Sequence, residues 1–262
     1  MSNGATIEAG RRRDRRLSDL TGNEVTKGEV MADTNIEWAE KVWNPITGCS
    51  KLSPGCDHCY AERMAHRLAG RCGYPEVHPF QVTFHKDKLN SPLSWKRGKR
   101  IFVNSMGDLF HPGVKTEWVE EVLRVMDGCP QHTFMVLTKR PEQAMQFFTG
   151  RVARPITNLW FGVTTENQKA ADDRTYILRN IPAAVRFVSV EPMLGPVSLE
   201  LFDYRIDWVI CGAETGPKAR YMDPTWAKSL YTQCRDAHVP FFMKKMSGGL
   251  AIPNGLMVRE LP

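Results

Sequence analysis

Three cysteines lie within eleven residues of one another, at Cys49, Cys56 and Cys59, and their spacing is suited to metal chemistry. Pro54-Gly55 places a loop between the first two thiols. A disulfide framework would leave one thiol over, and a four-cysteine zinc site would need a fourth ligand that this segment does not supply. Three thiolates suit a [4Fe–4S] cluster that keeps one iron free for a small molecule. We therefore predict that this loop holds such a cluster.

A zinc knuckle is the alternative interpretation of the same loop. Structural zinc takes four ligands, so the fourth would have to come from Cys72, His58 or His66. Of the other cysteines, Cys129 and Cys234 fall within predicted helices or at their ends, where we expect buried, inert thiols.

Short apolar runs rich in β-forming residues recur along the chain, and each ends in a polar cluster followed by a helical pattern. We expect strands at residues 43–48, 101–104, 134–138, 159–164, 186–190, 208–211 and 240–243, and helices at 60–68, 116–126, 141–148, 167–179 and 224–237. Strands that alternate with helices indicate βαβ units and a parallel sheet. Both a parallel α/β barrel and a doubly wound open sheet fit this pattern.

Polar residues follow almost every predicted strand, where the carboxyl ends of parallel strands meet at one rim. The residues at these ends are Asp108, Lys139 with Arg140, Glu166 with Asn167, Glu191, Cys211 with Glu214, and Lys244 with Lys245. The cysteine loop follows the first predicted strand. We therefore expect it to share the rim with these side chains.

Length and composition indicate one folded domain preceded by a tail. The chain has 262 residues, of which 42% are hydrophobic and 24% charged, so residues 31–262 suffice for a single barrel-like catalytic domain. Residues 1–30 contain an arginine-rich run and no period that could bury a face, which predicts a disordered basic leader.

The charge and the cysteine count restrict the setting and the partners. The sequence has no apolar run of about 18 residues and no apolar core after the basic N-terminus, so we expect a cytoplasmic protein without a membrane partner. Seven cysteines, an odd number, favour reduced thiols over disulfides. The net charge of +6 is modest and favours a solvated surface, and a polyanion contact is the alternative.

Seven ordered motifs together resemble an uncharacterised phage-protein family that is related to radical S-adenosylmethionine (radical SAM) enzymes such as spore photoproduct lyase. The resemblance runs from about residue 36 to about residue 245. The motifs are Trp43-Asn44-Pro45, the three-cysteine loop with Tyr60-Ala61-Glu62-Arg63, Asn104-Ser105-Met106-Gly107-Asp108, Leu137-Thr138-Lys139-Arg140-Pro141, Gly162-Val163-Thr164-Thr165-Glu166-Asn167-Gln168, Glu191-Pro192 and Gly212-Ala213-Glu214-Thr215-Gly216.

The resemblance implies a radical SAM-like fold, a partial (β/α) barrel of six to seven parallel strands. It also implies that Cys49, Cys56 and Cys59 hold the cluster and that S-adenosyl-L-methionine chelates its open iron. Reductive cleavage, driven by an external electron donor, would give a 5′-deoxyadenosyl radical. The gap between Cys49 and Cys56 is longer than in the commonest radical SAM pattern, which lengthens the loop without changing the number of ligands.

Several rim residues acquire predicted roles from this resemblance. Asp108 lies where relatives hold the methionine amino group, and Lys139 or Arg140 would pair with the methionine carboxylate. The remaining predicted cofactor contacts are Glu166, Asn167, Glu191, His58 and Tyr60, and the predicted catalytic residues on the substrate side are Glu214 and Cys211.

The basic balance and the phage context favour a nucleic-acid base or nucleotide as the substrate, in a modification or repair reaction. Two other functions remain open. One is a zinc protein that interacts with nucleic acid without radical chemistry, and the other is a cluster-bearing electron-transfer or binding module.

Overall fold

The structure is a computed structural model that describes residues 1, 34, 36–151 and 156–262. Apart from Met1, the predicted basic leader lies outside the described residues.

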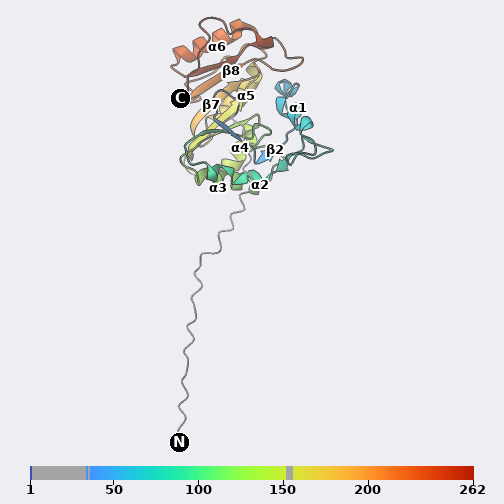
Figure 1. The fold of residues 1–262 in the computed structure, drawn as a ribbon. Helices are drawn as coiled ribbons and strands as arrows, with labels where there is room; N and C mark the ends of the chain where they lie inside the picture. The colour runs from blue at the N-terminus through green and yellow to red at the C-terminus, as the bar shows by residue number, and fades with distance from the viewer. Residues whose placement is uncertain (2–33, 35, 152–155) are drawn as a thin grey trace. The chain divides into compact units, whose positions relative to one another are not determined.

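Seven parallel strands form one curled sheet, which makes a half-barrel (Figure 1). This confirms the predicted α/β partial barrel. The strands run in the order β1 (Lys41–Trp43), β4 (Arg100–Val103), β5 (Thr133–Thr138), β6 (Ile156–Thr164), β7 (Ala183–Val190), β8 (Trp208–Gly212) and β9 (Phe241–Lys245).

Helices connect most successive strands, whereas residues 191–207 join β7 to β8 without a helix. The helices are α1 (Tyr60–Arg67), α2 (Lys86–Leu89), α3 (Thr116–Asp127), α4 (Pro141–Phe148), α5 (Gln168–Leu178) and α6 (Pro224–Asp236), with short 3₁₀ turns at Pro54–Cys56, Ser91–Ser94 and Ser247–Gly249. Figure 1 shows α2 and α3 near one end of the sheet and α6 near the other.

The first predicted strand, residues 43–48, is wrong as a barrel strand. The sheet strand ends at Trp43, and Ile46–Thr47 (β2) instead pairs antiparallel with Thr83–Phe84 (β3). The cause is Pro45, which has no N–H to donate to a ladder and so interrupts the sheet. The amide of Ile46 donates to Asn104 Oδ1 instead, at 3.2 Å.

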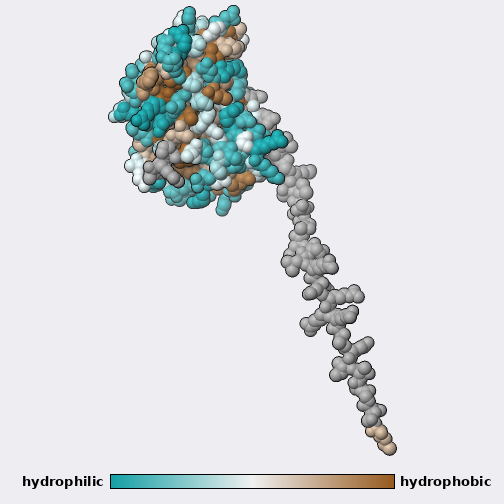
Figure 2. Space-filling view, turned by 90° about the vertical axis from the view of Figure 1, so that its left-hand side faces the viewer, coloured by the Kyte–Doolittle hydropathy of each residue, from teal (hydrophilic) through white to brown (hydrophobic). Residues whose placement is uncertain are grey.

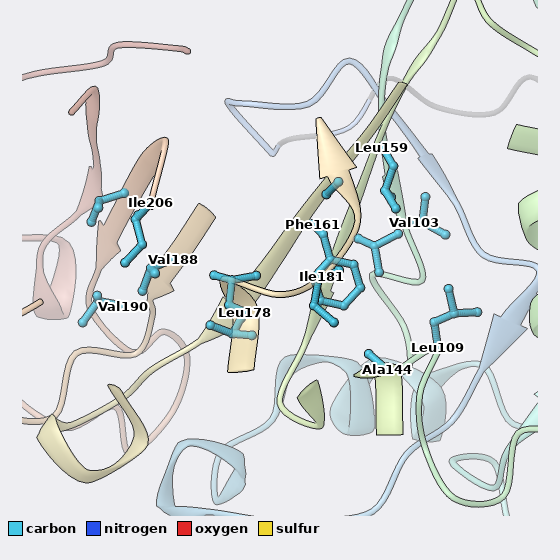
Figure 3. Packing of buried hydrophobic residues seen from close by; sticks show 14 of the residues in the cluster. Val103, Leu109, Ala144, Leu159, Phe161, Leu178, Ile181, Val188, Val190 and Ile206 are labelled. Atoms are coloured by element: carbon cyan, nitrogen blue, oxygen red, sulfur yellow. The ribbon is translucent and has the colours of Figure 1, made fainter. Parts of the chain in front are cut away.

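Alternate strand residues face the helices and form the main core. Figure 3 shows Val103, Phe161 and Val188 of the strands together with Ala144 of α4 and Leu178 of α5. All five residues are buried. This packing holds the strand order, and with it the order of the polar groups at the strand ends.

The residues between them point into the concave side of the half-barrel, which aromatic rings fill. Trp208 is fully buried there, with ring centroids at 5.5 Å from Phe187, 6.1 Å from Trp160 and 6.2 Å from Trp38. Pairs of this kind contribute about 0.5–1.5 kcal/mol each beyond their buried area. Apolar rings therefore fill the concave side behind the polar groups at the carboxyl ends of the strands.

The surface shown in Figure 2 is largely hydrophilic, and its apolar residues lie in scattered patches. Within the described part of the chain, none of the helices has the length and apolar character needed to span a bilayer.

Candidate functional site

The cysteine loop, residues 49–59, runs from β2 to α1. Its three thiols are partly buried, and all seven cysteines of the chain are free. The loop turns through the 3₁₀ segment Pro54–Cys56, and Cys59 is the residue that precedes α1. Three reduced thiols thus lie on one short segment at the rim.

A first clamp, formed by Asp108 and Arg140, holds the beginning of this loop. Arg140 is buried, and its Nη2 donates to the carbonyl oxygen of Ser50 at 2.9 Å. Its Nη1 lies 3.3 Å from Cys49 Sγ and 3.2 Å from Asp108 Oδ2. A guanidinium that bridges a carboxylate, a thiol and a carbonyl fixes all three groups in one geometry.

The carboxylate of Asp108 is fully engaged by its own surroundings. Its Oδ1 accepts from Thr138 Oγ1 at 2.7 Å and from the amide of Phe110 at 3.0 Å, and its Oδ2 accepts from the amide of Lys139 at 3.2 Å. The structure therefore places Asp108 as the support of Arg140 and of the turn after β5.

His111 extends the first clamp to the side chain of Ser50. Its Nδ1 accepts from the amide of Gly113, so Nε2 carries the proton and donates to Ser50 Oγ at 2.8 Å. Burial and the neighbouring Arg140 lower the pKa of His111, which keeps the ring neutral.

A second clamp, formed by Glu214 and Arg220, holds the other half of the loop. Arg220 Nη2 donates to the carbonyl oxygen of Pro54 at 2.8 Å, and Nη1 pairs with Asp57 Oδ2 at 3.2 Å. Glu214 Oε2 accepts from Arg220 Nε at 2.9 Å and from His58 Nδ1 at 2.9 Å. Arg220 thus ties the loop to the end of β8.

Glu214 has the most strongly shifted carboxyl pKa of this site. Burial alone would raise it, but the hydrogen bonds from Arg220 and His58 outweigh burial and lower the pKa to about 2. The side chain is therefore ionised at neutral pH and acts as the anchor of the second clamp.

The thiols of the loop differ in acidity. Burial and the charge of Asp108 raise the pKa of Cys49 to about 11, against the opposing effect of Arg140. Burial also acts to raise the pKa of Cys56, but Lys139 and hydrogen bonds from the amides of Leu52 and Ser53 outweigh it and lower the pKa. Cys56 is therefore more readily deprotonated than Cys49.

The carboxylates after β6 and β7 are also paired. Glu166 is almost fully buried and accepts from Arg174 Nη1 at 2.9 Å, while Glu191 forms two contacts with Lys244 Nζ at 2.8 and 2.9 Å. The loop packs directly on Glu166, since a Cβ added to Gly55 would lie 3.2 Å from the carboxyl carbon of Glu166. These two acids therefore help to build the rim.

The other predicted site residues have different surroundings. Asn167 caps α5 by accepting from the amide of Ala170 at 2.9 Å, and the ring of Tyr60 is largely exposed. Lys139 is half-buried, and its Nζ has no hydrogen-bond or ion-pair partner among the described residues. Cys211 is fully buried in the main core, where its Sγ lies 3.7 Å from Met193 Sδ, and burial with the charge of Glu191 raises its pKa.

The model of the protein family described as protein of unknown function (DUF5131) matches residues 33–253. The chain belongs to this family. No curated protein and no solved structure matches the chain. The family match includes the cysteine loop, both clamps and all seven strands of the half-barrel. The family description names no activity, so the relation to radical SAM enzymes stays a prediction.

The cysteine loop of this DUF5131 member suits an iron–sulfur cluster by its donor chemistry. Three thiols lie on one partly buried segment, with Arg140 beside Cys49 and Lys139 near Cys56 to favour thiolates. Across residues 36–151 and 156–262, no group of three or more His, Cys, Asp or Glu side chains is arranged to hold a metal ion.

Sequence reasoning named Arg140 as a site residue but missed Arg220 and Arg174, and it assigned no role to Ser50 or His111. The one available signal was an arginine six residues after Glu214, and another eight residues after Glu166. An arginine six or eight residues after a glutamate is common on protein surfaces. Without the fold, this spacing does not show that the two side chains are paired.

Proposed function

We propose that the chain is a radical SAM-like enzyme that binds a [4Fe–4S] cluster through Cys49, Cys56 and Cys59. The observation that supports this proposal most strongly is that the cysteine loop is anchored at two points. The loop carries three thiols and lies where the carboxyl ends of the parallel strands meet. Arg140 fastens Cys49 and Ser50, and Arg220 fastens the loop at Pro54 and Asp57. A loop held at both halves limits the positions that its thiols can reach.

The cluster, with S-adenosylmethionine on its open iron, would supply reductive cleavage of that molecule and hydrogen abstraction from a substrate. Within the chain, Arg140 favours the thiolate of Cys49 against the cost of burial, and Lys139 does the same for Cys56.

Lys139 is also the residue proposed to receive the methionine carboxylate. Its Nζ has no side-chain partner among the described residues, and it lies close enough to lower the pKa of both Cys56 and Glu166. Arg140, whose donors already serve Asp108, Cys49 and Ser50, would instead keep its role in the clamp. The buried rings behind the rim exclude water from the concave side.

The test is anaerobic reconstitution of the full chain with iron and sulfide, followed by metal analysis and incubation with S-adenosylmethionine and a reductant. We expect about four irons per chain, a broad absorbance band at about 400 nm and release of 5′-deoxyadenosine. Cys56→Ala should lose the cluster. Cys72→Ala, which removes an exposed thiol outside the loop, is the matched control and should retain it.

Three results would contradict the proposal in different ways. Stoichiometric zinc in a colourless protein would favour the zinc alternative, and loss of that zinc in Cys72→Ala would identify the fourth ligand. Iron without release of 5′-deoxyadenosine would favour an electron-transfer or binding module. Full iron content in Cys56→Ala would show that the ligand assignment is wrong.

A further inference from the structure

A cavity of about 440 Å³ lies on the β8–β9 side of the rim, next to the second clamp. One wall follows β8 and consists of residues 214–216 and 219. The other consists of residues 244 and 245 of β9 with residues 246, 248–250 and 252 of the segment that follows. Its volume falls within the range of about 300–1,000 Å³ that is usual for small-molecule sites.

An irregularity in β9 brings two neighbouring lysines to this cavity. Cys211 of β8 pairs with Met243, but Gly212 pairs with Lys245, so Lys244 is an extra residue on the β9 side. In a regular strand consecutive side chains point to opposite faces, whereas a bulge re-aims them. Both Lys244 and Lys245 line the cavity as a result.

Among the described residues that line the cavity, Lys245 is a cation without an anionic partner. Glu214 is bound by Arg220, and Lys244 is bound by Glu191 through both carboxylate oxygens. Lys245 is exposed and forms no ion pair with any residue that the structure describes. The cavity therefore carries an excess of positive charge, which favours an anionic ligand.

The floor next to these lysines is bare backbone. Gly248 and Gly249 have φ values of 61° and 76°, and nothing lies within 4 Å of the position that a Cβ would take on either residue. Glycines of this kind let a ligand approach the main chain closely, as at phosphate sites. Beyond them, Met246, Leu250 and Ile252 form an apolar side.

We infer that this cavity binds a nucleotide, with its phosphate at Lys245 and the Gly248-Gly249 backbone and its base against Leu250 and Ile252. A free cation beside bare backbone suits a phosphate, and an adjacent apolar surface suits a base. The cavity borders Glu214, which is hydrogen-bonded to His58 of the cysteine loop. The role of this nucleotide as the substrate rests on the proposed function, whereas the binding of a nucleotide to the cavity is independent of that function.

The test is isothermal titration calorimetry with the full chain in its cluster-free form. The ligands are the four nucleoside 5′-monophosphates, the corresponding nucleosides and a 5′-phosphorylated single-stranded DNA ten-mer. We expect at least one phosphorylated ligand to bind about tenfold or more tightly than its unphosphorylated counterpart. Preference for the monophosphate or for the ten-mer identifies a free nucleotide or a nucleic-acid strand as the source of the phosphate.

Lys245→Glu should weaken that binding by about tenfold or more, because it replaces the free cation by an anion. Lys228→Glu makes the same charge change at an exposed position of α6 and should leave the affinity unchanged. Absence of binding at millimolar ligand would overturn the inference, as would an equal loss in both variants or no loss in Lys245→Glu. Because no iron is needed, a failure here is distinct from a failure of the cluster proposal.

Discussion

Replacement of Glu214 by glutamine tests the second clamp. Glu214 accepts one hydrogen bond from His58 and three from Arg220, and together they lower its pKa from 4.5 to about 2 in spite of burial. A glutamine is neutral like the protonated acid, and a difference of about 2.5 pKa units corresponds to about 3 kcal/mol. We expect Glu214→Gln to lower the free energy of unfolding by up to about 3 kcal/mol at pH 7. This is the upper value, because the Arg220 side chain is 32% exposed and water screens part of the interaction.

The same variant should show a defined dependence on pH. Since folding lowers the pKa of Glu214, its carboxylate contributes full stability above the unfolded pKa of 4.5 and loses it as the pH falls toward 2. The difference between wild type and variant should therefore shrink to about 1.5 kcal/mol at pH 3.

Urea unfolding at both pH values, followed by tryptophan fluorescence, measures this difference. Glu200→Gln is the matched control, because Glu200 is exposed and forms no ion pair with a described residue. Equal stability of Glu214→Gln and wild type at pH 7, or a loss of the same size at both pH values, would refute the electrostatic account of the clamp.

Two further predictions concern the loop and its neighbourhood. In the metal-free protein at pH 8, iodoacetamide should label Cys56 faster than Cys49, because the pKa of Cys56 is lowered and that of Cys49 is raised to about 11. Peptide mass spectrometry over time gives both labelling rates. Faster labelling of Cys49 would contradict this order of thiol acidity. Gly216→Ala should destabilise the fold by about 1–3 kcal/mol, because Gly216 has a φ of 99° and the guanidinium of Arg63 occupies the place of a Cβ. Gly195→Ala, with nothing within 4 Å of its Cβ position, should leave the melting temperature nearly unchanged, and an equal shift in both variants would show that the Arg63 contact is not the cause.

The half-barrel was predictable because its signals are local. Most strands are short apolar runs with a helical pattern after them, and this repetition indicates a parallel sheet without knowledge of any distant contact. The first strand was misplaced because Trp43 and Ile46–Thr47 lie close together in the sequence although Pro45 separates them into two strands. The position of Cys211 shows a related limit, since a residue near the end of a strand that is buried on both faces gives no sign of which face it takes.

The clamps were not predictable, because they depend on partners that are distant in sequence. Arg140 contacts Cys49 from 91 residues away, and Arg220 contacts Pro54 from 166 residues away. Sequence alone predicted carboxylates at the rim and assigned Asp108 to a cofactor and Glu214 to the substrate side. In the fold, Asp108 and Glu214 are each paired with an arginine, which the sequence did not predict.

The two clamps also set an order for the assembly of the protein. The first is complete once the chain has extended beyond β5, but the second needs residues that come after β8, late in synthesis. Contacts between residues that are far apart in the sequence form late in folding, because the intervening chain must first be ordered. Until then the loop exposes three thiols with only its first half fixed. Under the proposed function, the loop would therefore capture its metal only when the chain is nearly complete, and a C-terminal truncation before Arg220 would leave the thiols accessible to oxidation.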